Sequence, residues 1–118
     1  MNVYLSGPVT GRDYEDACAD FARAAARLRR ADHEVWVPTE RVAYGTDHDH
    51  AMRECLDALA NDYFPGVDTL VLLPGWEGSE GASLERDVAR ACGIRVMELE
   101  EALGGQIKFR SVGKLGTG

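Results

Sequence analysis

The feature of this sequence that most constrains its fold is an alternation of short apolar runs with segments of helical periodicity. Residues 67–73 (VDTLVLL) form a nearly continuous apolar run, which is typical of a central parallel strand covered on both faces. Residues 2–6, 34–37 and 94–99 form further strand-like runs. Strands separated by helices imply right-handed β-α-β crossovers. We therefore predict an α/β fold: a small doubly wound (flavodoxin/Rossmann-like) parallel sheet of about four to five strands with flanking helices, the first strand being central.

The helices are expected between these strands. Residues 13–31 and 82–92 carry apolar side chains at helical spacing, and a third helical pattern follows Thr46 and Asp49, which have the spacing of a capping box. Asp32 stands just after the first pattern, where helices usually need a left-handed residue, and Asp tolerates that conformation better than most residues.

Length and cysteine content suggest one intracellular domain. A chain of 118 residues has room for a single core, which we place at residues 1–104, followed by a flexible or partner-ordered tail at residues 105–118. The cysteines at positions 18, 55 and 92 are odd in number and fall in helical patterns. We expect them to be buried thiols in a reducing cytosol.

Charge limits the classes of partner. The chain has 13 Lys and Arg against 20 Asp and Glu, a net charge of −7. A broad nucleic-acid-binding face needs clustered positive charge, so we expect no nucleic-acid polymer as partner. A small anion held by backbone N–H groups and one or two Arg is still compatible with this charge. No apolar stretch approaches the ~20 residues that span a bilayer, and the N-terminus lacks a secretory signal, so we expect a cytoplasmic protein without a membrane partner.

Ligands of doubly wound sheets bind beyond the carboxyl ends of the strands, where the strand order reverses. The segment after the first strand should lie there. N–H groups of a turn that opens a helix bind anions, and side-chain donors could assist them. The alternative is an ordinary strand–helix turn, because the segment is neither a Walker loop nor GxGxxG. The candidate binding residues of this turn are Ser6, Gly7, Thr10, Gly11 and Arg12.

The segment after the third strand, residues 74–81, should meet the first at the same edge. Trp76 stands there on a glycine-flanked loop, where its ring could cover a purine or pyrimidine; alternatively, it packs against the edge of its own domain. Ser79 is expected to cap the next helix, to donate to a ligand, or both. The candidate binding residues of this segment are Gly75, Trp76, Ser79 and Gly81.

Glu85 is the most informative residue. On a helical wheel at about 100° per residue with Gly81 at zero, the apolar residues of 82–92 span an arc from about 280° through zero to about 100°, and Glu85 falls near its middle at about 40°. A carboxylate buried without partners costs several kcal/mol. Either Glu85 lines a pocket, or it simply lies near the start of the helix, or the helix phase differs from this wheel. A semi-buried, ionised carboxylate suits nucleophilic attack on a sugar carbon or general-base work.

Two other groups are candidate site residues. Tyr4 lies in the first strand, so its hydroxyl could reach the same pocket, or it could bond to backbone inside the core. Residues 47–50 (DHDH) resemble metal ligands, but no third ligand is identifiable and Asp is favoured where a helix begins. We therefore expect no metal site.

Three stretches of the sequence carry a family resemblance: residues 3–11 (VYLSGPVTG), residues 33–38 (HEVWVP) and, above all, residues 72–85 (LLPGWEGSEGASLE). They are similar to the nucleoside 2-deoxyribosyltransferase-like superfamily. More narrowly, they resemble the small DUF4406-type proteins of bacteria and their viruses. The resemblance covers about residues 1–100 and leaves out the tail.

The resemblance implies an activity. It makes Glu85 the nucleophile that attacks the anomeric carbon of a nucleoside or nucleoside monophosphate, matches Tyr4 to an aromatic residue of strand one, and lets the turn at residues 6–12 help to bind phosphate. It implies no metal or organic cofactor, and a homodimer or larger homo-oligomer in which a neighbouring subunit often completes the site. The expected function is that of an N-glycosidase or deoxyribosyltransferase.

The sequence departs from the transferases at two aspartates that contact the substrate. Cys55 stands where the helix before strand three should carry one, and Asp57 points about 200° away from it. The second aspartate, in the loop before the glutamate, has no clear counterpart. The alternative function is therefore a non-catalytic module that binds a nucleotide or nucleotide-derived signal in the same pocket.

Overall fold

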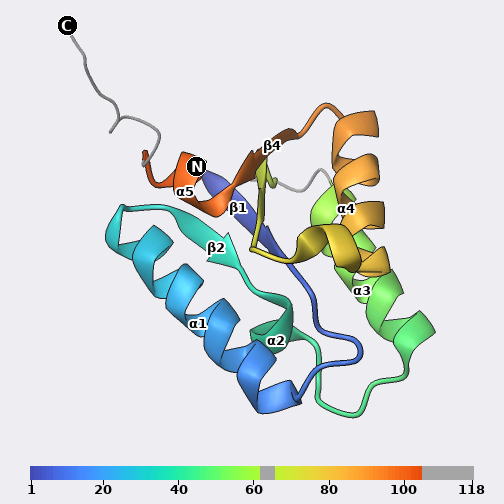
Figure 1. Ribbon diagram of the computed structural model, residues 1–118. Helices are drawn as coiled ribbons and strands as arrows, with labels where there is room; N and C mark the ends of the chain where they lie inside the picture. Colours follow the sequence, from blue (N-terminus) through green and yellow to red (C-terminus); the bar gives the residue numbers. More distant parts are fainter. Residues whose placement is uncertain (62–65, 105–118) are drawn as a thin grey trace, which may run out of the picture.

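Four short strands form one parallel sheet in the order β2-β1-β3-β4 (Figure 1). The computed structural model describes residues 1–61 and 66–104; the predicted tail lies outside these residues. The strands are β1 (Asn2–Ser6), β2 (Glu34–Trp36), β3 (Thr69–Leu72) and β4 (Arg95–Glu98). The expected α/β class, the all-parallel pairing and the central first strand are confirmed, and the fold is a small Rossmann-like one.

The central strands β1 and β3 are covered on both faces, as Figure 1 shows: α1 (Tyr14–Arg30) lies on one side, and α3 (His48–Ala60) and α4 (Glu80–Ala91) lie on the other. Successive side chains of a strand point to opposite faces. Those on the α1 side join one apolar cluster, which includes Val3, Leu5, Phe21, Leu28, Val71 and Leu73. Those on the other side join a second cluster, which includes Tyr4, Cys55, Leu59, Leu70, Leu72 and Ala89.

Side-chain caps fix where the long helices begin. Ser79 caps α4 as predicted, because its Oγ accepts the Ala82 N–H at 3.1 Å. The predicted capping box of α3 is wrong by one residue: Asp47 is the cap and accepts the His50 N–H at 3.0 Å. The Thr46 hydroxyl instead donates to a carbonyl of the preceding turn.

Short helical elements were not foreseen. They are α2 (Pro38–Arg41), the 3-10 turn η1 (Trp76–Gly78) and α5 (Leu99–Ala102). Pro38 follows the predicted second strand directly and opens α2, which suits its fixed φ and missing N–H. Asp32 has a φ of 69°, so the predicted left-handed residue is confirmed.

The expectation that all three cysteines are buried is wrong. Cys55 is buried and Cys18 is half-buried, but Cys92 is exposed. The helical wheel placed Cys92 on the apolar arc, yet α4 ends at Ala91, and a residue beyond the helix no longer follows its periodicity. In the described part of the chain, no helix combines the length and apolar character needed to cross a bilayer.

Candidate functional site

Glu85 lies on the buried side of α4, with 7% of its surface exposed. The prediction that its carboxylate faces inward is confirmed. Helix α4 begins at Glu80, two residues before the predicted start, so Glu85 lies in the second turn. The helix macrodipole acts mainly in the first turn, so specific hydrogen bonds must stabilise this carboxylate.

Two hydroxyl groups of β1 supply those hydrogen bonds. The Tyr4 hydroxyl donates to Glu85 Oε2 at 2.6 Å, and the Ser6 hydroxyl donates to Glu85 Oε1 at 2.6 Å. Tyr4 and Ser6 are two positions apart on a strand, so they share the face that α4 covers. Each carboxylate oxygen thus receives one donor and keeps a further lone pair for a ligand.

Burial controls the ionisation of this cluster. Burial raises the pKa of Glu85 above its ordinary 4.5, against the hydrogen bonds of Ser6 and Tyr4, which lower it. Burial, and then the nearby Glu85 charge, raise the pKa of Tyr4 well above 10.0, so the phenol keeps its proton and acts as a donor. Within residues 1–61 and 66–104, no Lys or Arg side chain forms an ion pair with Glu85.

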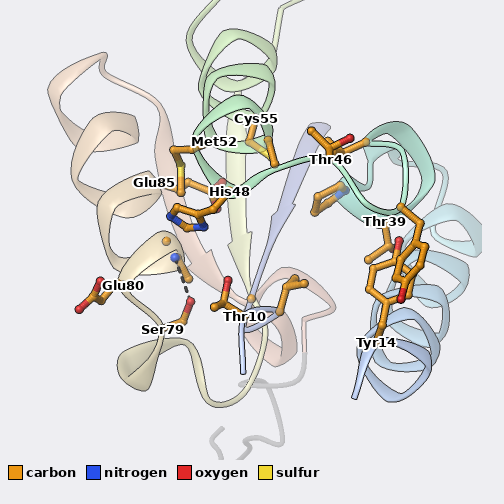
Figure 2. Close-up of a pocket in the computed structure, with 18 of the residues that line it drawn as sticks. Thr10, Tyr14, Thr39, Thr46, His48, Met52, Cys55, Ser79, Glu80 and Glu85 are labelled. Carbon is orange, nitrogen blue, oxygen red and sulfur yellow. Dashed lines mark hydrogen bonds between the residues drawn. The ribbon is translucent and has the colours of Figure 1, made fainter. Parts of the chain in front are cut away.

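The carboxylate opens onto a cavity of about 630 Å³ (Figure 2). Its walls come from the β1–α1 turn, from the segment between β2 and α3 with the first turns of α3, and from the start of α4. The sheet order reverses between β1 and β3, and the Leu73 N–H donates to the Ser6 carbonyl there at 2.8 Å. The cavity therefore lies at the predicted edge of the sheet.

Some of the predicted site residues lie together at the cavity, and others do not. Glu85 lines the cavity together with Gly7, Thr10, Ser79 and Gly81. Tyr4 and Ser6 are buried behind the carboxylate, bonded to its oxygens. The cavity lining does not include Gly11, Arg12, Gly75 or Trp76.

Arg12 is engaged elsewhere. Its guanidinium donates to Asp20 at 2.6 Å and to the Pro8 carbonyl at 3.2 Å. Asp20 also accepts from Arg23 on the next turn of α1. The predicted cationic donor of the turn is therefore held along α1 by a local carboxylate and not beside Glu85.

Of the two alternatives predicted for Trp76, covering a base or packing against its own domain, the structure shows the second. It borders the apolar cluster that contains Tyr4 and Leu72, and the Arg86 guanidinium carbon lies 5.1 Å from its ring centroid. Its indole Nε1 is buried without a hydrogen-bond partner in the described structure. It does not cover the cavity.

Sequence reasoning missed the wall that follows β2. Tyr44, His48 and Met52 line the cavity from this side. All carboxyl ends of a parallel sheet share one edge, so the segment after the second strand had to reach the same place as the other two. This topological signal was available once four parallel strands were predicted.

Cys55 is buried at the cavity wall beside Tyr4, and Asp57 is exposed. The DHDH stretch forms the start of α3, with Asp47 as its cap. In the described ranges, no three His, Cys, Asp or Glu side chains gather into a group that could hold a metal ion.

The family model described as Domain of unknown function (DUF4406) matches residues 1–98. The chain therefore belongs to the DUF4406 family. Neither the comparison with curated proteins nor that with solved structures gives a match.

Proposed function

We propose that this protein cleaves the N-glycosidic bond of a nucleoside or nucleoside monophosphate, as an N-glycosidase or deoxyribosyltransferase with Glu85 as nucleophile. The observation that carries the proposal is a carboxylate 7% exposed, held by two hydroxyl groups at 2.6 Å and open to a cavity. The sequence resemblance to the nucleoside 2-deoxyribosyltransferase-like superfamily supports it. A carboxylate used only for stability would pair with a cation or face water.

The chemistry divides into two displacements. A Glu85 oxygen forms a bond to the anomeric carbon, and the bond from that carbon to the base nitrogen breaks. The base leaves with the electron pair and takes a proton from water. Water or a second base then attacks the same carbon and releases the carboxylate. Tyr4 and Ser6 orient the oxygens and stabilise the charge on Glu85 before attack and after release.

The 5′ end of the substrate meets a wall without cationic side chains. The described lining of the cavity contains no Lys or Arg, and Arg12 is bonded to Asp20. A monophosphate would therefore be bound by N–H groups at the starts of α1 and α4, assisted by the Thr10 hydroxyl. Comparing each nucleoside with its monophosphate measures this contribution.

A second candidate is a binding module that holds the nucleotide without cleaving it. The thiol of Cys55 in place of the expected transferase aspartate favours this candidate, because a thiol with a pKa raised by burial is a poor proton donor to a leaving base. The cavity would then serve only recognition.

Base release from a panel of nucleosides and their monophosphates, followed by chromatography, separates the two candidates. Glu85→Gln should abolish release, whereas the matched control Glu77→Gln, an exposed glutamate of η1 outside the cavity, should retain it. Thermal stabilisation by a ligand without base release supports the binding module. Absence of both release and stabilisation across the panel contradicts both candidates.

Two further properties belong to the proposal. Because the pKa of Glu85 is raised, base release should decline on acidification at a pH above that of an ordinary glutamate. We also propose that the protein works as a homodimer or larger homo-oligomer, which light scattering coupled to size exclusion tests directly.

A further inference from the structure

Two tyrosines form an aromatic pair in the cavity wall. Tyr14 is the first residue of α1, and Tyr44 lies between α2 and α3. Their ring centroids are 4.6 Å apart with an interplanar angle of 51°, and both residues line the cavity. Figure 2 shows Tyr14 across the cavity from Ser79, Glu80 and Glu85.

Tyr44 is highly exposed to solvent for a large side chain. It is 79% exposed, and it and Leu84 are the exposed large hydrophobic residues of the described chain. Leu84 lies on α4 outside the cavity lining, whereas Tyr44 lines the cavity. An uncovered aromatic ring in a cavity offers contact area that a ligand can bury.

Two hydrogen bonds close the turn that carries Tyr44. Tyr44 stands in a turn closed by the Thr46 N–H, which donates to the Ala43 carbonyl at 3.1 Å, and by the Thr46 hydroxyl, which donates to the same carbonyl at 2.7 Å. Gly45 has a φ of 91°, a value that other residues rarely adopt. The turn therefore positions Tyr44 before any ligand arrives, which lowers the entropy lost on binding.

The wall around the pair combines apolar and hydroxyl side chains. Val9, Pro38, Val42 and Ala43 line the cavity, as do Thr39 and Thr46, which Figure 2 shows on the side of Tyr14. The opposite wall carries the carboxylates of Glu80 and Glu85 and the Ser79 hydroxyl. The cavity thus combines a polar, reactive wall with an aromatic one.

We infer that Tyr44, backed by Tyr14, is the subsite that stacks the planar heterocyclic base of the ligand while the sugar lies toward Glu85. The inference rests on the proposed function and adds to it the residues that bind the base. The sequence predicted this role for Trp76, which packs elsewhere. Stacking on a tyrosine tolerates both purines and pyrimidines, because each base has a π-face.

Binding of free adenine and free cytosine, measured by titration calorimetry, tests this subsite without any cleavage. Tyr44→Ala should weaken both bases by about 5- to 150-fold, the range set by loss of one stacking contact. Tyr44→Phe keeps the ring and should bind within about twofold of wild type, and Leu84→Ala, the exposed residue outside the cavity, should bind as wild type. Deoxyribose 5-phosphate, a probe without a base, should bind Tyr44→Ala and wild type equally.

The inference is overturned if wild type binds neither base, or if Tyr44→Ala binds both as tightly as wild type. It is also overturned if Tyr44→Ala only changes the oligomeric mass and leaves base affinity intact, because Tyr44 would then serve a contact between copies. Failure of the proposed function is a separate outcome: no base is released from any nucleoside, while binding of the free bases still depends on Tyr44.

Discussion

Replacing Glu85 by Gln tests the physical state of the buried carboxylate. The substitution removes a negative charge from a side chain that is 7% exposed and keeps its shape. The amide oxygen can accept from one hydroxyl, and the amide nitrogen can donate to the oxygen of the other. We expect the variant to be more stable than wild type at neutral pH, because burial disfavours the charged form that wild type carries there.

The magnitude follows from two opposing effects. A hydrogen bond to a charged group contributes about 1.5–3 kcal/mol and a neutral one about 0.5–1.5 kcal/mol, so losing charge from the bonds of Tyr4 and Ser6 costs about 2–3 kcal/mol. The variant also avoids the free-energy cost of burying a charged carboxylate, which is several kcal/mol. The net gain is about 1–2 kcal/mol, typical of removing a strained functional group. For a chain of this size it corresponds to a rise in Tm of about 4–8 °C.

The pH dependence gives the sharper test. The pKa of Glu85 is raised in the folded state, so the native carboxyl binds its proton more tightly than the unfolded chain does. Its contribution to stability is fully present below the unfolded pKa, near 4.5, and is lost as pH rises through the raised native pKa. The advantage of Glu85→Gln should therefore be smallest in acid, grow through this window and stay constant above it.

Urea unfolding of wild type, Glu85→Gln and the exposed control Glu77→Gln, at a series of pH values from about 4 to about 8, measures these free energies. The control should follow wild type throughout, because Glu77 is exposed. The reasoning is refuted if Glu85→Gln is less stable than wild type at neutral pH, or if the difference between them does not change with pH.

Three other substitutions have defined outcomes. Tyr4→Phe removes one hydrogen-bond donor from Glu85, so the free energy of unfolding measured in urea should fall by about 1–3 kcal/mol. The same hydrogen bond lowers the pKa of Glu85, so the decline of base release on acidification should begin at a higher pH in the variant. An unchanged pH profile would contradict the role of this hydroxyl. Gly7→Ala places a Cβ 2.9 Å from Leu73 Cβ, so thermal unfolding should show a loss of about 1–3 kcal/mol, and an unchanged Tm would mean that the strands separate at no cost. Ser79→Ala removes the cap of α4 and should lower stability in urea by about 1 kcal/mol; no change would show that water replaces the hydroxyl.

Local patterns carried the prediction of the fold. Residues 69–73 of the apolar run are buried, because alternate side chains meet different helices on the two faces of the sheet. Periodicity failed at two positions, both of which are exposed: Cys92 lies one residue beyond the end of α4, and Leu84 lies within α4 at the margin of the apolar arc. The short helix that begins at Pro38 lacks the length over which periodicity can be read.

The inward orientation of Glu85 was determined by the sequence alone, because the angle of a residue on a helix depends only on its neighbours along the chain. Its hydrogen-bond partners were decided by the tertiary structure. Ser6 and Tyr4 are 79 and 81 positions away, and only the packing of α4 across β1 brings their hydroxyls to the carboxylate. The pairing of Arg12 with Asp20 and the placement of Tyr44 in the cavity wall likewise depend on side-chain geometry and chain topology, which no periodic pattern of single residues encodes.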